Sequence, residues 1–325
     1  MKILHIGNTA GVATQLRNAQ RRLGHKSDIL RFSRGAKNYD SDYYFTGYYS
    51  KNIPSVFGKG IRLIENISYL CQLIDDYDVL HFHFYTVIGG NVAPRKLPQG
   101  LDLLLWKINN KKIIKHHHGS DIRHRGVPYL QKKFADMRLV STPDLLDWDP
   151  GAELVLNPIV TDNYEYVGVE EVPNSEPITL VHAPTDRKKK GTASVIDAIE
   201  DLQKEGLNIK LRIVENTPNE EAIEIYKQAD IIADRFKLGW YGVFSIEAMC
   251  LGKPVLVYMK DEYKKYAPDA PVVDTPINKL KKNIKLLAQD FGLRNKLAQE
   301  GRKFVEKRHD AEEVGKKLIR IYENC

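Results

Sequence analysis

The chain has 325 residues, of which 42% are hydrophobic and 28% are charged, and its formal net charge is +7. This length suits two domains better than one core, and no stretch approaches the ~20 apolar residues that span a bilayer. The three cysteines, Cys71, Cys250 and Cys325, lie far apart without disulfide or metal-site spacing, which predicts a cytoplasmic protein. Because no nucleic-acid-binding signature accompanies the basic charge, we expect phosphorylated substrates or an anionic membrane surface as partners, and no nucleic acid.

Strands and helices alternate along the whole chain, which predicts an α/β protein with parallel, doubly wound sheets. The first strand is predicted over residues 2–7, and a loop that contains Gly11 leads from it into a helix that ends near Gly24. The glycines of this loop lack the spacing of a dinucleotide-binding fingerprint. A plain strand-to-helix turn therefore explains them as well as a ligand site does.

Residues 39–50 hold five tyrosines and one phenylalanine, and an amphipathic helix is predicted after them over residues 57–74, with Lys59 and Arg62 near its start. Tyrosine suits the boundary between apolar and wet surroundings. The segment could therefore contact a lipid-linked acceptor or a membrane surface, or its rings could pack on their own domain.

Two later strands are rich in histidine. Strand alternation places His81 with His83, and His116 with His118. Such pairs could form a hydrolase-type metal site or a zinc site shared between the strands, with Asp121 as the carboxylate ligand. The other interpretation is that these histidines are hydrogen-bonded interior residues.

A basic segment follows the strand predicted over residues 178–184. Arg187 and Lys190 come just before Gly191 and a helix predicted over residues 192–206. Guanidinium and ammonium groups beside the free amides of a helix start suit a diphosphate. A run of basic residues is otherwise most often a solvated surface.

The most informative stretch is residues 230–259, which predicts a strand, a loop with Gly239 and Gly242, a helix and a second strand. The two glycines allow the backbone to approach a ligand closely, and the helix after them offers amides to a phosphate. Glu247, in the first turns of this helix, could accept hydrogen bonds from a ligand hydroxyl. An ordinary helix–strand unit with turn glycines is the simpler interpretation.

The block from Gly242 to Met249, followed by Gly252, Lys253 and Pro254, resembles the signature of the retaining family 4 glycosyltransferases, of the type that builds bacterial and archaeal surface glycans. The resemblance implies the GT-B fold: two doubly wound Rossmann-like domains that face each other across a cleft, with a C-terminal helix that crosses back to the N-terminal domain. In that family two glutamates lie eight positions apart. Glu247 matches the second, which holds the donor ribose, whereas Gly239 stands where the first would lie near the transferred sugar, so Asp234 or Trp240 could replace that contact.

The resemblance also implies roles for individual residues. His118, followed by Gly119, Ser120 and Asp121, matches an element that positions the acceptor or the sugar, although His117 is close enough to be confused with it. The expected catalytic residues are His118, Arg187, Lys190 and Glu247. The expected donor-binding residues are Gly11, Arg187, Lys190, Gly239, Trp240, Tyr241, Gly242, Val243, Phe244 and Glu247.

We therefore expect an N-terminal acceptor domain of residues 1–160 with 311–325, and a donor domain of residues 161–310. The expected reaction is retaining transfer of a sugar from a nucleotide-diphosphate donor, with UDP-sugar favoured, to a glycan or lipid-linked saccharide. No cofactor or metal is expected, and the location is cytoplasmic, with peripheral binding to the inner face of the membrane as a further hypothesis. A catalytically silent GT-B protein that binds nucleotide or stabilises a partner, and a metal-dependent hydrolase, are the alternatives.

Overall fold

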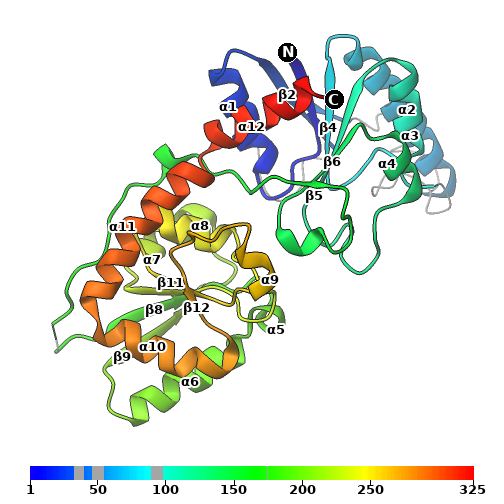
Figure 1. The fold of residues 1–325 in the computed structure, drawn as a ribbon. Coiled ribbons are helices and arrows are strands. Elements are labelled where there is room, and N and C mark those ends of the chain that lie inside the picture. The colour runs from blue at the N-terminus through cyan, green and yellow to red at the C-terminus, as the bar shows by residue number, and fades with distance from the viewer. Residues whose placement is uncertain (33–39, 46–54, 89–97, 174) are drawn as a thin grey trace. The chain divides into compact units, whose positions relative to one another are not determined.

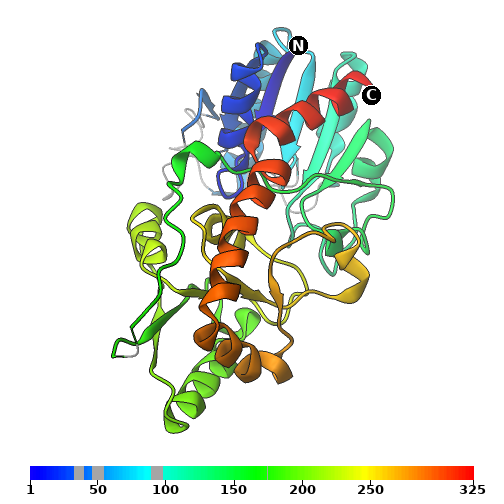
Figure 2. The same ribbon diagram turned by 60° about the vertical axis from the view of Figure 1, so that its left-hand side comes forward.

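The structure is a computed structural model that describes residues 1–32, 40–45, 55–88, 98–173 and 175–325. The chain forms two compact units, one of Met1–Pro158 with Ala311–Cys325 and one of Ile159–Asp310. Each unit is built on a single parallel sheet with helices packed against it (Figures 1 and 2).

The sheet of the first unit has seven strands in the order β3-β2-β1-β4-β5-β6-β7, and all pairs are parallel. This order, which reverses direction beside β1, is typical of a doubly wound fold. The strands are β1 (Lys2–Ile6), β2 (Lys26–Arg31), β3 (Tyr43–Tyr44), β4 (Val79–His83), β5 (Lys112–His117), β6 (Met137–Val140) and β7 (Glu153–Leu154).

Helices cover both faces of this sheet because successive strand side chains point to opposite sides. Leu4 and Leu80 belong to a core with α2 and α3, whereas Ile3 and Val79 belong to a core with α1 and α12. The helices are α1 (Val12–Arg22), α2 (Ser55–Ile74), α3 (Leu101–Ile108), α4 (Tyr129–Phe134) and α12 (Ala311–Glu323), with a short 3₁₀ turn at Pro143–Leu145.

The second unit has five parallel strands in the order β12-β11-β10-β8-β9. One face is covered by α6 and α10, and α8 packs on β11 with α11 against it. The strands are β8 (Ile178–His182), β9 (Ile209–Ile213), β10 (Ile231–Ala233), β11 (Val255–Val257) and β12 (Val273–Asp274). The helices are α5 (Arg187–Lys190), α6 (Thr192–Lys204), α7 (Asn219–Lys227), α8 (Val243–Cys250), α9 (Asp261–Lys264), α10 (Leu280–Gln289) and α11 (Phe291–Arg308), with 3₁₀ turns at Thr161–Asn163 and Ile277–Lys279.

The last helix belongs to the first unit. Val314, Leu318 and Tyr322 are buried in the same core as α1, and α12 lies beside α1 in both ribbon views (Figures 1 and 2). Gly315 allows the close approach, because a Cβ there would lie 3.4 Å from the Cβ of Ala19. The predicted return of the C-terminal helix to the N-terminal domain is thus confirmed.

Part of the tyrosine-rich segment lies outside the described residues, namely Tyr39 and residues 46–50, and so do the side chains of Lys59 and Arg62. Of the tyrosines that are described, Tyr43 and Tyr44 form the short edge strand β3. In the described part of the chain, no helix has both the length and the apolar character that crossing a bilayer requires.

Candidate functional site

The basic segment after β8 is a single helical turn, α5. Asp186 begins this turn, because its Oδ1 accepts a hydrogen bond from the Lys189 amide at 3.0 Å. Gly191, with φ of 81°, adopts the left-handed conformation that redirects the chain from α5 into α6.

The two basic residues singled out by the sequence point to different surroundings. Arg187 is more than half exposed and forms a two-pronged pair with Glu215, with Nε to Oε1 at 2.9 Å and Nη2 to Oε2 at 2.6 Å. Lys190 is buried, and its Nζ donates to Asp234 Oδ1 and lies 5.4 Å from the centre of the Phe244 ring. Only Lys190 is therefore part of the interior of the second unit.

Asp234 follows β10 directly and organises the start of α8. Its Oδ2 accepts hydrogen bonds from the Gly242 amide at 3.0 Å and from Ser245 Oγ at 2.6 Å, while Oδ1 accepts from Lys190. Burial opposes ionisation of Asp234, but the cations of Lys190 and Arg235 outweigh it and hold its pKa well below the usual range. The carboxylate is therefore charged and fully engaged, so it does not replace the glutamate that Gly239 displaces.

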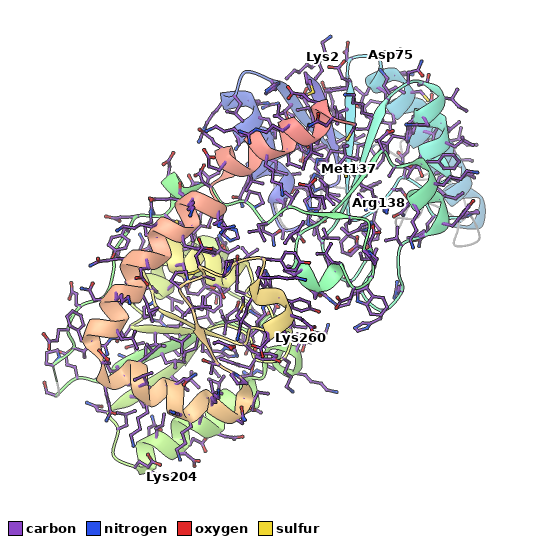
Figure 3. All side chains as sticks on the ribbon, in the orientation of Figure 1. Lys2, Asp75, Met137, Arg138, Lys204 and Lys260 are labelled. Atoms are coloured by element: carbon purple, nitrogen blue, oxygen red, sulfur yellow. The ribbon has the colours of Figure 1, made fainter. Side chains whose placement is uncertain are left out.

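A side chain at either glycine of the loop before α8 would collide with a neighbouring residue, and the neighbour differs between the two positions. Gly239 has φ of 74°, and a Cβ there would lie 2.6 Å from Cγ of Lys260, which is labelled in Figure 3. Gly242 has an extended backbone, but a Cβ would lie 1.9 Å from Nη2 of Arg235. Arg235 thus lies directly on the backbone at the start of α8.

The aromatic residues of this loop pack into the second unit. Trp240 and Tyr241 are buried, and their stacked rings have centres 4.4 Å apart. The Tyr241 hydroxyl is 2.9 Å from Nε2 of His309 at the end of α11. Phe244 is buried against Tyr226 at 4.7 Å, and Val243 is half-buried at the first position of α8. Because the Trp240 ring is part of the core, it too does not take the place of the missing glutamate.

Glu247 is 9% exposed and has one described hydrogen bond, which the Tyr164 hydroxyl donates to Oε1 at 3.1 Å. Burial raises the pKa of Glu247 to about 7, although the bond from Tyr164 acts in the opposite direction. The carboxyl can therefore change its protonation state near neutral pH. Its position in α8, one turn after Gly242, agrees with the predicted helix.

Two residues of this site were missed in the sequence. Tyr164 lies in the connection before β8 and carries no motif, so nothing in the sequence pointed to it. Arg235 could have been found, because it lies just beyond the carboxyl end of β10, and ligands of open parallel sheets bind at that edge.

In the first unit, Gly11 has φ of 77° and precedes α1, which begins without a side-chain cap. His117 and His118 point to opposite faces of β5. His117 Nδ1 donates to Asp121 Oδ2 at 2.7 Å, whereas His118 is half-buried with Nε2 3.0 Å from Nδ1 of His83. Burial lowers the pKa of His117 to about 4 and that of His118 to about 3, so both imidazoles are neutral at pH 7.

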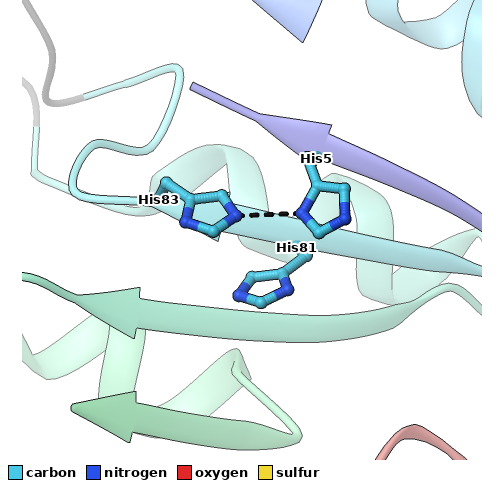
Figure 4. Close-up of side chains that lie close together, drawn as sticks. All are labelled: His5, His81 and His83. Carbon is cyan, nitrogen blue, oxygen red and sulfur yellow. Dashed lines mark hydrogen bonds between the residues drawn. The ribbon is translucent and has the colours of Figure 1, made fainter. Parts of the chain in front are cut away.

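Five histidines form one cluster on the face of the sheet that α1 and α12 cover. The predicted pairs are present: the ring centres of His81 and His83 are 4.3 Å apart, and so are those of His116 and His118. His5 of β1 joins them, and Figure 4 shows it hydrogen-bonded to His83 beside His81. Asp121, which the metal-site interpretation would use as the carboxylate ligand, is bonded to His117, and among the described residues both candidate metal-binding groups consist of histidines alone.

Comparisons with known proteins identify the architecture. No family model and no curated protein sequence matches the chain. Among solved structures, sucrose-phosphate synthase from Thermosynechococcus elongatus is 15% identical with a TM-score of 0.68, over 100% of this chain and 99% of that one. An alpha-glucosyltransferase in complex with UDP-glucose and DNA containing an abasic site is 13% identical with a TM-score of 0.64, over 99% and 98%. UDP-GlcNAc 2-epimerase from Neisseria meningitidis, bound to UDP-GlcNAc, is 13% identical with a TM-score of 0.58, over 100% of both chains.

These similarities extend over the full length of both partners in each comparison, at identities that define the fold alone. The protein therefore has the GT-B fold, with two Rossmann-like units and a C-terminal helix that returns to the first, as the sequence predicted. Several of the similar structures are glycosyltransferases and others are epimerases, so the architecture is shared by more than one reaction.

Proposed function

We propose that the protein is a retaining glycosyltransferase that moves a sugar from a nucleotide-diphosphate donor, a UDP-sugar, to a hydroxyl of a glycan or a lipid-linked saccharide. The observation that carries this proposal is the arrangement around α8. The buried Lys190–Asp234 pair fixes the Gly242 amide and the first turn of the helix, and Glu247 lies one turn further on. Structural similarity to glycosyltransferases described with UDP and UDP-glucose supports a nucleotide-sugar donor.

The chemistry requires stabilisation of the diphosphate as it leaves. Arg187 is close to the start of α6 and exposed, so it can exchange Glu215 for a phosphate, while the first-turn amides of α8 supply further donors. Glu247 then accepts hydrogen bonds from the donor ribose. These groups orient the donor before reaction and bind the charge that develops during it.

The transfer itself needs no carboxylate base. The bond between the anomeric carbon and the phosphate oxygen breaks, the acceptor oxygen bonds to the same face of that carbon, and the departing phosphate takes the acceptor proton. In this proposal His118 positions the acceptor or the sugar, and the donor site works without a metal because protein cations and helix amides provide the positive charge. Peripheral binding to an anionic membrane would bring the enzyme to a lipid-linked acceptor.

Calorimetric titration with UDP, GDP and CMP tests the donor site. One nucleotide should bind, and Arg187→Ala and Glu247→Ala should each weaken it roughly ten- to more than a hundredfold, since bonds to charged groups contribute about 1.5–3 kcal/mol. Lys188→Ala is the matched control, because Lys188 is an exposed neighbour in the same helical turn and should leave the affinity unchanged. A protein that binds none of the three nucleotides would not be a transferase of this kind.

The presence of Gly239 supports a second candidate, a catalytically silent GT-B protein that binds nucleotide. Gly239 has no side chain to contact the sugar, and neither Asp234 nor Trp240 is free to replace one. Incubation with radiolabelled UDP-sugars and a panel of lipid-linked acceptors separates the candidates. A protein that binds UDP tightly but transfers or hydrolyses none of the sugars would favour the silent one.

A further inference from the structure

The five-histidine cluster occupies a place that is otherwise apolar. Nearer the start of the strands, the same face of the first sheet carries Ile3, Val79 and Ile114, which pack against α1 and α12. Nearer the carboxyl ends, imidazoles replace these side chains. Four of the five rings are fully buried and the fifth, His118, is half-buried. The cluster consists of His5, His81, His83, His116 and His118.

The hydrogen bond between His5 and Gln20 determines which ring nitrogens donate and which accept in the first series of linked imidazoles. Gln20 Oε1 accepts from Ser27 Oγ at 2.8 Å and lies 2.8 Å from Nε2 of His5, so His5 donates through Nε2. A neutral His5 then accepts at Nδ1, and His83 donates to it through Nε2 over 2.9 Å. His83 is left with a lone pair on Nδ1, directed at Nε2 of His118 at 3.0 Å.

A second chain ends on a nitrogen without a partner. The Tyr322 hydroxyl lies 2.6 Å from Nδ1 of His81, and His81 Nε2 lies 3.3 Å from Nδ1 of His116. Among the described residues, nothing bonds to Nε2 of His116, although that atom is buried. A buried ring nitrogen without a partner is unfavourable, and one that adjoins two further imidazoles is a candidate metal ligand.

We propose that His83, His116 and His118 bind one divalent transition-metal ion of the zinc type. One ring nitrogen from each lies within 4.8 Å of the other two, and the geometry favours Nδ1 of His83 with Nε2 of His116 and of His118. Zn–N bonds of 2.0–2.1 Å place tetrahedral ligand nitrogens about 3.3 Å apart, close to the 3.0 Å that separates His83 from His118.

Neighbouring side chains hold the proposed ligands in place through their outer ring nitrogens. The outer nitrogen of His83 is bonded to His5, and that of His116 faces His81, which is bonded to Tyr322. Such outer partners orient ligating histidines and increase their basicity. Three neutral imidazoles without a carboxylate favour zinc, cobalt, nickel or copper over magnesium and calcium, and the half-buried His118 leaves the fourth position for a water molecule.

The other candidate group, His5 with His81 and His83, is a poorer site. His5 and His83 are bonded to each other through the nitrogens that face inward (Figure 4), and both nitrogens of His81 have partners. Binding there would break several hydrogen bonds. At the proposed site, the ion replaces one bond, between His83 and His118, and gives the free nitrogen of His116 a partner.

Cobalt titration of tag-free, metal-stripped protein tests the proposal. Wild type should bind one Co²⁺ per chain with the visible absorption of a four-coordinate ion, and added Zn²⁺ should displace it. His116→Gln and His118→Gln should each weaken binding at least about tenfold. His117→Gln is the matched control and should bind like wild type. His117 is also buried, and its Nε2 has no hydrogen-bond partner among the described residues, but it faces the other side of β5.

A wild-type protein that shows no cobalt spectrum, or a His117→Gln variant that loses as much affinity as His116→Gln, would overturn the site. Should a variant fail to fold, ¹⁵N spectra of histidine-labelled wild type decide instead: Zn²⁺ should shift the ring nitrogens of three histidines, and unchanged spectra would refute binding. UDP affinity, measured with and without metal, reports separately on the donor site in the second unit.

Discussion

Replacing Asp234 by asparagine should leave the buried ammonium group of Lys190 without a counter-charge. Asparagine keeps one oxygen, which can still accept from the Gly242 amide and from Ser245, but it presents an amide group to Lys190 in place of a carboxylate. Lys190 is 5% exposed and Asp234 is completely buried. Removing one partner of such a pair typically costs about 3–5 kcal/mol, because the remaining charge is buried without compensation.

That cost is a large part of the 5–15 kcal/mol by which domains are usually stable. For a unit the size of Ile159–Asp310, each kcal/mol of unfolding free energy that is lost lowers the thermal midpoint by roughly 2–4 °C. Asp234→Asn should therefore lower the midpoint by roughly 6–20 °C. Differential scanning calorimetry measures this midpoint directly, and it can resolve separate transitions of the two units.

Asp186→Asn is the matched control. It is the same substitution in a carboxylate that also faces a lysine of α5, but Asp186 and Lys189 are solvent-exposed and asparagine caps a helix as well as aspartate does. The control should leave the midpoint unchanged. If Asp234→Asn lowers the midpoint no more than Asp186→Asn does, the argument from the buried ion pair is refuted.

Three further predictions concern the same unit. Glu247 binds its proton more tightly in the folded state, with a pKa of about 7, so its contribution to stability is complete below pH 4.5 and is lost as the pH rises to 7. Between these pH values, the free energy of unfolding of Glu247→Gln, measured in urea, should rise relative to that of wild type by up to about 3 kcal/mol. A difference between the two proteins that does not change with pH would contradict the raised pKa. Tyr164→Phe removes the hydrogen bond to Glu247, so the pH dependence of UDP affinity should move to higher pH in calorimetry, whereas Tyr226→Phe should leave it in place. Gly239→Ala should lower the thermal midpoint more than Gly206→Ala, because both have positive φ but only Gly239 faces Lys260 at 2.6 Å; equal effects would show that the contact with Lys260 is unimportant.

Much of the fold could be predicted because it depends on local patterns. Alternating apolar strands and amphipathic helices specify parallel sheets covered on both faces, and the apolar positions Val314 and Leu318 mark α12 as a packed helix. The order of the strands depends on pairings between distant segments, which the periodicity of one segment does not contain. His5 illustrates this, because it joins the cluster only through the pairing of β1 with β4.

The same distinction applies to the candidate site. The glycines, the basic turn and Glu247 were found because they lie in short continuous motifs. Their partners lie far along the chain: Asp234 is 44 residues from Lys190, and Tyr164 is 83 residues from Glu247. A charge run also does not say which cation turns inward, and here burial separates Lys190 from Arg187.

Gly239 departs from the glycosyltransferase pattern for a reason that the backbone makes clear. A glutamate there would have to adopt φ of 74° and displace Lys260, whose amide donates to the Gly239 carbonyl at 3.0 Å. The loop is thus built around a glycine, and it is not a glutamate loop with one side chain removed. The same loop keeps Arg235 against Gly242 and Asp234 against the start of α8. These buried contacts depend on one another, and together they fix the conformation of the loop and of the first turn of α8.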